Sequence, residues 1–126
     1  MIIILDTSIW IEYFRGTAEY FDTCQQLLEK GEVSTIEIIF AELLQGTLNN
    51  SEADIVKAYY ELIVKVEIDN LYILAGEFSR QEKLVNKGIG LIDACIITAT
   101  LKSNAKLWTL DKKIKNYLSD EFLFVT

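Results

Sequence analysis

Four acidic residues lie where the surrounding sequence gives little reason for a surface charge: Asp6, Glu42, Asp93 and Asp111. Asp6 and Asp111 each follow an apolar segment that predicts a buried strand, so we expect both carboxylates at one edge of a sheet. Glu42 and Asp93 lie in predicted helices and have no lysine or arginine three or four residues away. A buried carboxylate is costly unless it is hydrogen-bonded, paired with a cation or bound to a metal. A cluster of such oxygen ligands would favour Mg²⁺ or Mn²⁺.

Each acid taken alone also has an ordinary structural explanation. Asp6 could simply end a strand and begin a turn. Asp111 is a candidate N-cap, and Lys115, one helical turn later, could pair with it. Asp93 lies in the first turn of a predicted helix, where the helix dipole stabilises negative charge. Glu42 is the most informative, because capping does not explain an acid in the middle of a helix on the shoulder of its apolar stripe.

The rest of the composition narrows the possible chemistry. Histidine is absent, which excludes Ser-His-Asp and Cys-His nucleophile systems and zinc sites with histidine ligands. The two cysteines, Cys24 and Cys95, are too few for a disulfide scaffold and are expected to fill core space in a reducing cytoplasm. No glycine-rich nucleotide-binding motif is present. No apolar run is long enough for a membrane span, and none resembles an export signal.

Strands and helices are expected to alternate along the chain. The segments that predict strands are 1–5, 32–34, 64–68, 106–110 and 122–125. The segments that predict helices are 9–16, 18–30, 36–46, 51–63, 71–88, 91–101 and 112–118. With 126 residues and no linker-like stretch, the pattern predicts a single domain over residues 1–126. Its fold class is α/β, a three-layer sandwich around a mainly parallel sheet.

Some local patterns make finer predictions. The sequence from Ser34 to Glu37 matches a capping box, which would start a helix there. The helix that begins at Ser51 has a predicted apolar stripe made of Ile55, Ala58, Tyr59, Leu62 and Ile63. Apolar spacing from Leu71 to Val85 predicts one continuous helix as far as Gly88. The segment from residue 91 to 101 is apolar on nearly every side and predicts a buried helix.

In the order and spacing of four short segments, the chain resembles the PIN-domain ribonucleases, and most closely the VapC-type toxins of bacterial and archaeal toxin–antitoxin modules. The matching segments are 5–8, 41–43, 91–99 and 107–111. The resemblance implies a PIN-like α/β fold with an acidic pocket at the carboxyl edge of a parallel sheet. It also implies RNA cleavage that depends on Mg²⁺ or Mn²⁺, with Asp6, Glu42, Asp93 and Asp111 as the acidic quartet.

The resemblance further implies the surroundings and partners of this site. The hydroxyls of Thr7, Ser8 and Thr109 would lie beside the quartet. The partners would be an RNA substrate, a cognate antitoxin and a second copy in a homodimer, in the cytoplasm and away from membranes. Exposed side chains on the helices around Trp10 and Tyr59 could supply the surface for the antitoxin or the homodimer.

Positive charge for RNA binding is harder to find in the sequence. The net charge is −7, or −3 without the quartet, so the acidity weakens the case for RNA without excluding it. Lysines gather in the last quarter of the chain, at 102, 106, 112, 113 and 115, and Arg15 follows the first predicted helix. They could contact phosphates, or they could form a solvated face. Trp10 and Tyr13 could stack on bases, or they could belong to the core.

Other functions fit the sequence less well or make different predictions. A haloacid-dehalogenase-like phosphatase needs a second aspartate where Ser8 stands, and a receiver domain needs paired acids beside Asp6. The main alternative is a PIN-like module that binds RNA or a protein without cutting. Such a module has no need to keep a costly cluster of four acids.

Overall fold

Four short parallel strands form the centre of the protein, and the computed structural model describes residues 1–126. The strands are β1 (Ile3–Leu5), β2 (Val33–Thr35), β3 (Val64–Lys65) and β4 (Lys106–Trp108), in the order β3-β2-β1-β4. The helices are α1 (Thr7–Arg15), α2 (Ala18–Glu29), α3 (Glu37–Gln45), α4 (Asn50–Leu62), α5 (Leu71–Glu82), α6 (Leu91–Lys102) and α7 (Lys112–Tyr117). Two short 3-10 helices, η1 (Leu84–Lys87) and η2 (Asp120–Phe122), complete the fold.

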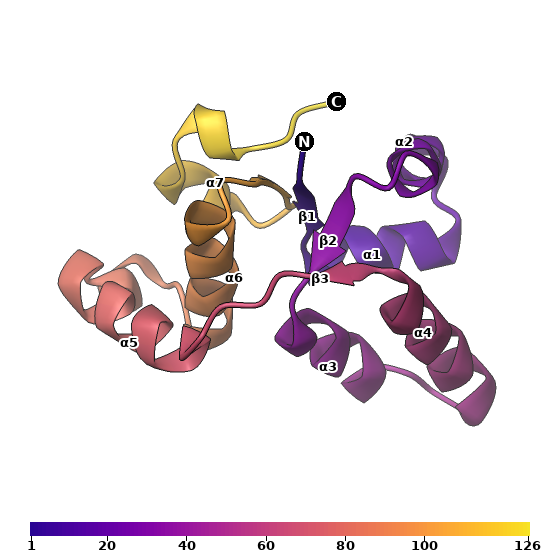
Figure 1. The fold of residues 1–126 in the computed structure, drawn as a ribbon, viewed down its shortest axis with the longest axis horizontal. Coiled ribbons are helices and arrows are strands. Elements are labelled where there is room, and N and C mark those ends of the chain that lie inside the picture. The colour runs from indigo at the N-terminus through magenta and orange to yellow at the C-terminus, as the bar shows by residue number, and fades with distance from the viewer.

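The direction of the chain crossovers explains why helices cover both faces of the sheet. From β1 to β2 and on to β3 the chain moves towards one edge, and right-handed crossovers put α1 to α4 on one face. The chain then returns to β4, beyond β1, so the same handedness puts α5 and α6 on the opposite face. Figure 1 shows α5, α6 and α7 on one side of the strands and α1, α2 and α4 on the other. The predicted three-layer α/β sandwich with a parallel sheet is confirmed.

The central strand is buried on both faces. Ile3, Ile4 and Leu5 have no exposed surface, as an uninterrupted apolar run predicts for the inner strand of a parallel sheet. Ile3 lies opposite Val33 of β2 and opposite Lys106 of β4, which fixes the register on both sides. This register brings the carboxyl ends of β1 and β4 together.

The helix α6 is buried around most of its circumference. Residues 94–100 are all buried, because α6 packs against both α5 and β4. The predicted buried helix is therefore confirmed. Both cysteines are free and buried, as predicted. Burial raises the pKa of the Cys24 thiol to about 11, which leaves it protonated and unreactive at neutral pH.

The predicted capping box at the start of α3 is wrong. Ser34 and Thr35 are buried in β2, where they pair with β1 and β3. The N-cap position of α3 is Ile36, which makes no side-chain capping bond. Sheet pairing takes the two hydroxyl residues away from the helix end, although their local sequence fits the capping pattern.

The apolar side of α4 differs from the predicted stripe. The helix is capped by Asn49, whose side chain accepts a hydrogen bond from the Glu52 N–H at 2.9 Å. Tyr59 and Ile63 of the predicted stripe do face the core, beside the buried Val56, whereas Ile55 and Leu62 are 50% and 80% exposed. The helix is therefore turned so that the position after Ile55 faces the core.

The predicted helix over residues 71–88 is interrupted. Lys83 adopts a left-handed conformation with φ of 55° and separates α5 from η1. The break buries Leu84 completely and leaves Val85 76% exposed. No glycine or proline marks this break, so the sequence gives no local signal for it.

The predicted strand over residues 122–125 is not formed. Only an isolated bridge joins Leu123 to Leu107 of β4, and the Phe124 N–H donates to the Leu107 carbonyl at 2.9 Å. The predicted strand over 64–68 is confirmed only in part, since β3 has two residues. Short edge strands of this kind leave few unpaired backbone groups.

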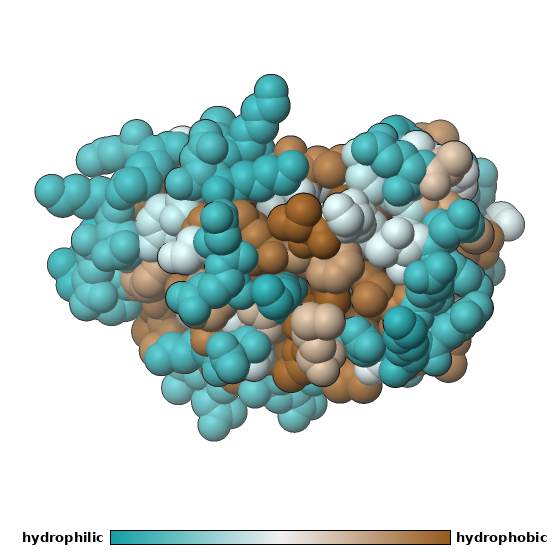
Figure 2. Space-filling model, turned by 90° about the horizontal axis from the view of Figure 1, so that it is seen from above, coloured by the Kyte–Doolittle hydropathy of each residue, from teal (hydrophilic) through white to brown (hydrophobic).

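The surface retains apolar residues among the charged ones. Figure 2, seen from the side of Figure 1 on which the two termini lie, shows hydrophobic residues gathered between two hydrophilic flanks. Every helix is too short or too polar to cross a membrane.

Candidate active site

The sheet topology has a switch point at the carboxyl ends of β1 and β4. These strands are neighbours, but α1 and α7, which follow them, lie on opposite sides of the sheet. In α/β proteins, ligands commonly bind at such a switch point, in a crevice outside the carboxyl ends of the strands. Asp6 follows β1 directly, and Asp111 lies three residues after the end of β4. Residues far apart in the sequence therefore meet at one edge of the sheet.

Asp6 is held by three hydrogen bonds and is only 6% exposed. Its Oδ1 accepts from the Thr7 backbone N–H at 2.8 Å, which caps α1. Its Oδ2 accepts from Thr109 Oγ1 at 2.6 Å and from Ser8 Oγ at 3.3 Å. Burial raises the pKa of Asp6, the three donors oppose that rise, and the charge of Asp111 adds to it. The net effect is a raised pKa, because no cation compensates for the loss of water.

Thr109 connects two of the acids. Its Oγ1 donates to Asp6 and accepts from the Asp111 backbone N–H at 3.0 Å. Asp111 Oδ1 in turn accepts from the N–H groups of Lys113 and Ile114, at 2.8 and 3.3 Å, and caps α7 as predicted. Asp111 Oδ2 accepts no hydrogen bond within the protein. One oxygen of this residue is therefore structural, and the other is free.

Glu42 reaches the same region from the middle of α3. It is half-buried, and its Oε1 accepts from Thr7 Oγ1 at 2.8 Å, while its Oε2 has no hydrogen-bond partner. Ser8 Oγ accepts the Leu110 backbone N–H at 3.2 Å, which ties the first turn of α1 to the end of β4. Together with Thr109, all three hydroxyls that the sequence placed beside the acids bind groups of this site.

Asp93 is the acid that the structure leaves without a partner. It lies half-buried in the first turn of α6, and neither of its carboxylate oxygens makes a hydrogen bond or an ion pair with the protein. Burial, together with the charges of Asp6, Asp111 and Glu42, raises its pKa to about 6, and the charge of Lys113 lowers it slightly. The other three acids therefore lie close enough to Asp93 for their charges to repel its carboxylate.

The donor chemistry of this region fits a hard divalent cation. Every side-chain atom here that could bind a metal is an oxygen. Glu42, Asp93 and Asp111 have carboxylate oxygens that accept no hydrogen bond from the protein. No group of three acids is close enough together to enclose a metal ion directly. Mg²⁺ does not need such a cage, since it keeps several waters and is commonly held by one or two carboxylates and substrate phosphates. The residues present therefore fit a hydrated cation.

Ion pairs do not neutralise the acids. The structure has two ion pairs, Arg15–Glu12 at 3.3 Å and Arg80–Glu77, and both lie within single helices. The predicted pairing of Lys115 with the N-cap of α7 is not formed. The negative charge at the crevice therefore remains uncompensated by direct contacts.

The aromatic residues proposed for base stacking belong to the core. Trp10 has no exposed surface and packs against Phe40, with ring centres 5.1 Å apart, and against Tyr13 and Tyr59 at 6.0 Å. Tyr13 is 4% exposed. The prediction of a partner-binding surface around Trp10 is therefore wrong for that residue, because helical spacing alone does not distinguish a core stripe from a surface one.

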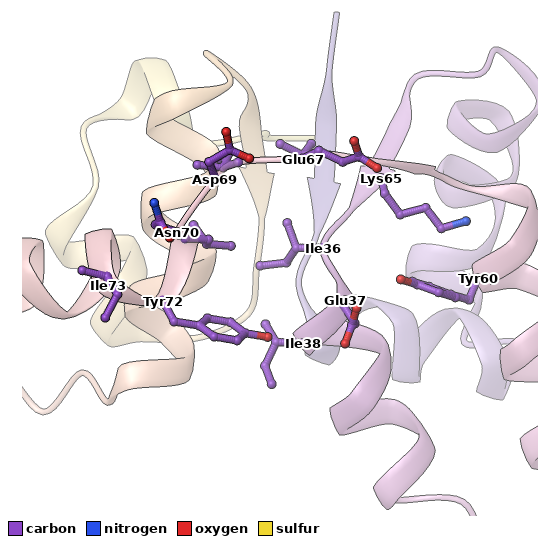
Figure 3. A pocket seen from close by; sticks show the side chains of 13 residues that line it. Ile36, Glu37, Ile38, Tyr60, Lys65, Glu67, Asp69, Asn70, Tyr72 and Ile73 are labelled. Atoms are coloured by element: carbon purple, nitrogen blue, oxygen red, sulfur yellow. The ribbon is translucent and has the colours of Figure 1, made fainter.

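A hollow of about 670 Å³ lies away from the acids, beyond β2 and β3. It is bounded by the start of α3 and by the segment that leads from β3 to α5 (Figure 3). Three acidic residues line it, Glu37, Glu67 and Asp69, and Lys65 Nζ lies 4.4 Å from the centre of the Tyr60 ring. None of the four candidate acids lines this space, so its size does not identify the reactive centre.

A second hollow, of about 580 Å³, contains one member of the quartet. It lies between α1, α3 and α4 and is lined by Glu42 and Arg15 together with mostly apolar side chains. Ile11, Leu48 and Ile55 on its wall are 38%, 88% and 50% exposed. An apolar groove therefore leads to the edge of the acidic crevice.

The family model described as the PIN domain matches residues 3–117, a segment that includes all four acids. The chain belongs to the PIN domain family. The predicted membership is thereby confirmed, and the parallel sheet is the one that the resemblance implied, whereas the role of the four acids stays a prediction.

Two known proteins show how similar this PIN domain is to VapC proteins. Ribonuclease VapC32 of Mycobacterium tuberculosis is 29% identical over 116 residues, which cover 90% of this chain and 87% of the relative. The crystal structure of VapBC2 from Rickettsia felis bound to a DNA fragment from their promoter contains a similar chain, with a TM-score of 0.74 and 21% identity. That comparison covers 98% of this chain and 96% of the other and shows that the fold is shared.

Proposed function

We propose that this PIN domain is a divalent-metal-dependent endoribonuclease that hydrolyses RNA phosphodiester bonds with Asp6, Glu42, Asp93 and Asp111. The observation that carries the proposal is the Asp93 carboxylate, which is half-buried, has no hydrogen-bond partner and is repelled by the charges of the other three acids. A cation bound there would relieve the repulsion among them. The mycobacterial relative is named a ribonuclease, which supports the same reaction.

The acids would have different tasks in this reaction. When bound, Mg²⁺ or Mn²⁺ supplies Lewis-acid charge and favours deprotonation of water. Asp6 is the rigid member, because Thr109 and the Thr7 amide fix both of its oxygens. Glu42 and Asp111 each offer one oxygen that accepts no hydrogen bond from the protein. Asp93 has both oxygens free, so it is the acid best placed to bind the cation or one of its waters.

We also propose that the chain is the toxin of a toxin–antitoxin pair in the cytoplasm and that it acts as a homodimer. The likeness to VapC32 and to a chain of the VapBC2 structure supports this role. The exposed apolar residues Leu48 and Ile55 beside Glu42 support a protein partner in the groove between α1, α3 and α4. A partner seated there would cover one edge of the acidic crevice.

The decisive experiment compares RNA cleavage by the wild type and by Asp6→Asn, Glu42→Gln and Asp93→Asn in Mn²⁺. The proposal requires at least a hundredfold loss of cleavage in each variant, with circular dichroism and melting showing that each still folds. Equal cleavage by the wild type and the three variants would refute it. RNA binding without cleavage by the wild type would favour the alternative, a PIN-like binding module.

Binding of the metal can be measured separately from cleavage. Mn²⁺ at 100 times its dissociation constant should stabilise the wild type by about 2.7 kcal/mol and Asp93→Asn much less. If neither protein is stabilised up to millimolar Mn²⁺, the acids do not form a metal site in the absence of RNA.

A further inference from the structure

One lysine of α7 packs against the turn that precedes α6. The side chain of Lys113 lies across Gly88, in the turn between η1 and α6. A Cβ atom at position 88 would lie 3.2 Å from Lys113 Nζ and 3.3 Å from its Cδ and Cε. Gly88 has a φ of +76°, a conformation that glycine adopts without strain. The missing side chain at this position is what lets the lysine lie flat against the turn.

The turn at Gly88 leads directly to Asp93 in the first turn of α6. Lys113 is the cation whose charge lowers the pKa of Asp93, against the three acids that raise it. It is nevertheless not an ion-pair partner, because no carboxylate lies within 4 Å of its ammonium. Lys113 therefore carries an exposed positive charge at the rim of the crevice that no protein group neutralises.

The position of α7 is fixed by contacts on the same side of the molecule. The Tyr117 hydroxyl donates to Glu82 at the end of α5 at 2.7 Å, and its ring packs edge-on against Phe78, with ring centres 6.2 Å apart. At the other end of the helix, Asp111 caps α7 through the backbone N–H of Lys113 itself. The backbone N–H of Lys113 thus binds Asp111, an acid of the site, and the Lys113 side chain packs against Gly88.

We propose that Lys113 is a substrate-binding residue, whose ammonium binds a phosphate of single-stranded RNA next to the reactive acids, on the side formed by α6 and α7. This inference rests on the proposed ribonuclease function and adds to it the first assigned contact with the substrate. The acids and their cation bind at one phosphate, and Lys113 holds the strand at a neighbouring one. The positive charge of Lys113 would locally offset part of the repulsion between RNA, which carries one negative charge per nucleotide, and a chain with a net charge of −7.

Lys115 provides a matched control on the same helix. It is also exposed, and it makes no hydrogen bond or ion pair with the protein. Lys113→Gln and Lys115→Gln therefore each remove one positive charge from α7. The first charge lies beside the acids, and the second lies elsewhere on the helix. Lys113→Arg keeps the charge and tests whether charge rather than packing matters.

The test measures binding of a short fluorescein-labelled RNA strand by anisotropy in Ca²⁺, over a series of salt concentrations. Lys113→Gln should weaken binding about two- to fivefold, the range of an exposed charge contact. It should also reduce the slope of log K against log salt by about 0.7, the value for one phosphate contact on a single strand. Lys115→Gln should leave both unchanged, and Lys113→Arg should stay close to the wild type. In cleavage assays with Mn²⁺, Lys113→Gln should raise KM and leave kcat nearly unchanged.

The outcomes separate this inference from the function on which it rests. If the wild type cleaves RNA and Lys113→Gln binds it with an unchanged slope, the lysine contact is wrong and the ribonuclease proposal stands. If the wild type binds RNA through Lys113 but does not cleave it, the contact stands and the ribonuclease proposal fails. Equal effects of Lys113→Gln and Lys115→Gln, or a loss of kcat at constant KM, would overturn the assigned role. Absence of any RNA binding would overturn both proposals.

Discussion

Replacing Asp93 by asparagine should stabilise the metal-free protein at neutral pH. The folded protein holds the pKa of Asp93 at about 6, whereas the ordinary value is 3.8. Between these two values the folded state binds a proton that the unfolded state has released. The stability that this proton provides is complete below pH 4 and is lost as the pH rises through 6. The charged carboxylate therefore opposes folding at pH 7, and asparagine removes that opposition.

The size of the effect follows from the two pKa values. The difference between 3.8 and about 6 corresponds to about 3 kcal/mol, at about 1.4 kcal/mol for each pH unit. Because Asp93 is only half-buried, solvent screening reduces this to about 1 to 2 kcal/mol. Urea unfolding in EDTA should then give Asp93→Asn a free energy of unfolding that is higher than that of the wild type at pH 8. The two proteins should be almost equally stable at pH 4.

The control and the contrary result are both well defined. Asp54→Asn removes the same charge from an exposed position on α4, and it should change the stability by less than about 0.5 kcal/mol at either pH. If Asp93→Asn is less stable than the wild type at pH 8, or if its advantage does not disappear at low pH, Asp93 is not the strained acid that the structure indicates. The inference that the other three acids repel the charge of Asp93 would then be wrong as well.

Four further substitutions test other parts of the structure by urea unfolding. Thr109→Val removes the hydroxyl that binds the buried Asp6 and should cost about 1 to 3 kcal/mol; a neutral result would contradict the role of this hydrogen bond. Gly88→Ala should lower the free energy of unfolding by about 1 to 2 kcal/mol, because Gly88 has a left-handed φ. Gly76 lies inside α5 with open space around it, so Gly76→Ala should raise the free energy of unfolding by about 0.5 to 1 kcal/mol. Thr98→Val replaces a buried hydroxyl that has no partner, so it should be neutral or stabilise by up to about 1 kcal/mol, and a clear loss would reveal an unseen hydrogen bond.

The sequence predicted the elements whose signal is local and strong. The run from Ile3 to Leu5 could only be a buried strand, and α6 was recognisable because its apolar residues leave no polar face. The predictions that were wrong failed because contacts between distant parts of the chain override the local sequence pattern. The strand β2 continues through Thr35, so Ser34 cannot cap α3 although it fits a capping pattern. The break at Lys83 depends on packing Leu84 into the core. No pattern within a few neighbouring residues contains that information.

The sequence was sufficient to predict which residues belong to the candidate site, but it did not predict all the side-chain contacts around them. Absence of a nearby cation singled out Glu42 and Asp93, and the sheet topology accounts for Asp6 and Asp111. Their role as a catalytic quartet stays a prediction. The side-chain path of Lys113 was not predictable, because it depends on a glycine that lies 25 positions away in the sequence and becomes its neighbour only after folding.

The hydrogen bond from Thr109 to Asp6 joins residues 103 positions apart, and this has a consequence during synthesis. β1 leaves the ribosome first, but its neighbour β4 is made only after both α5 and α6. Until then Asp6 has no Thr109 to hold it, and Asp111 does not yet exist. A nascent chain therefore carries three of the acids without being able to assemble them. Late closure of the sheet between β1 and β4 keeps the centre unformed until residues 106–111 have been made.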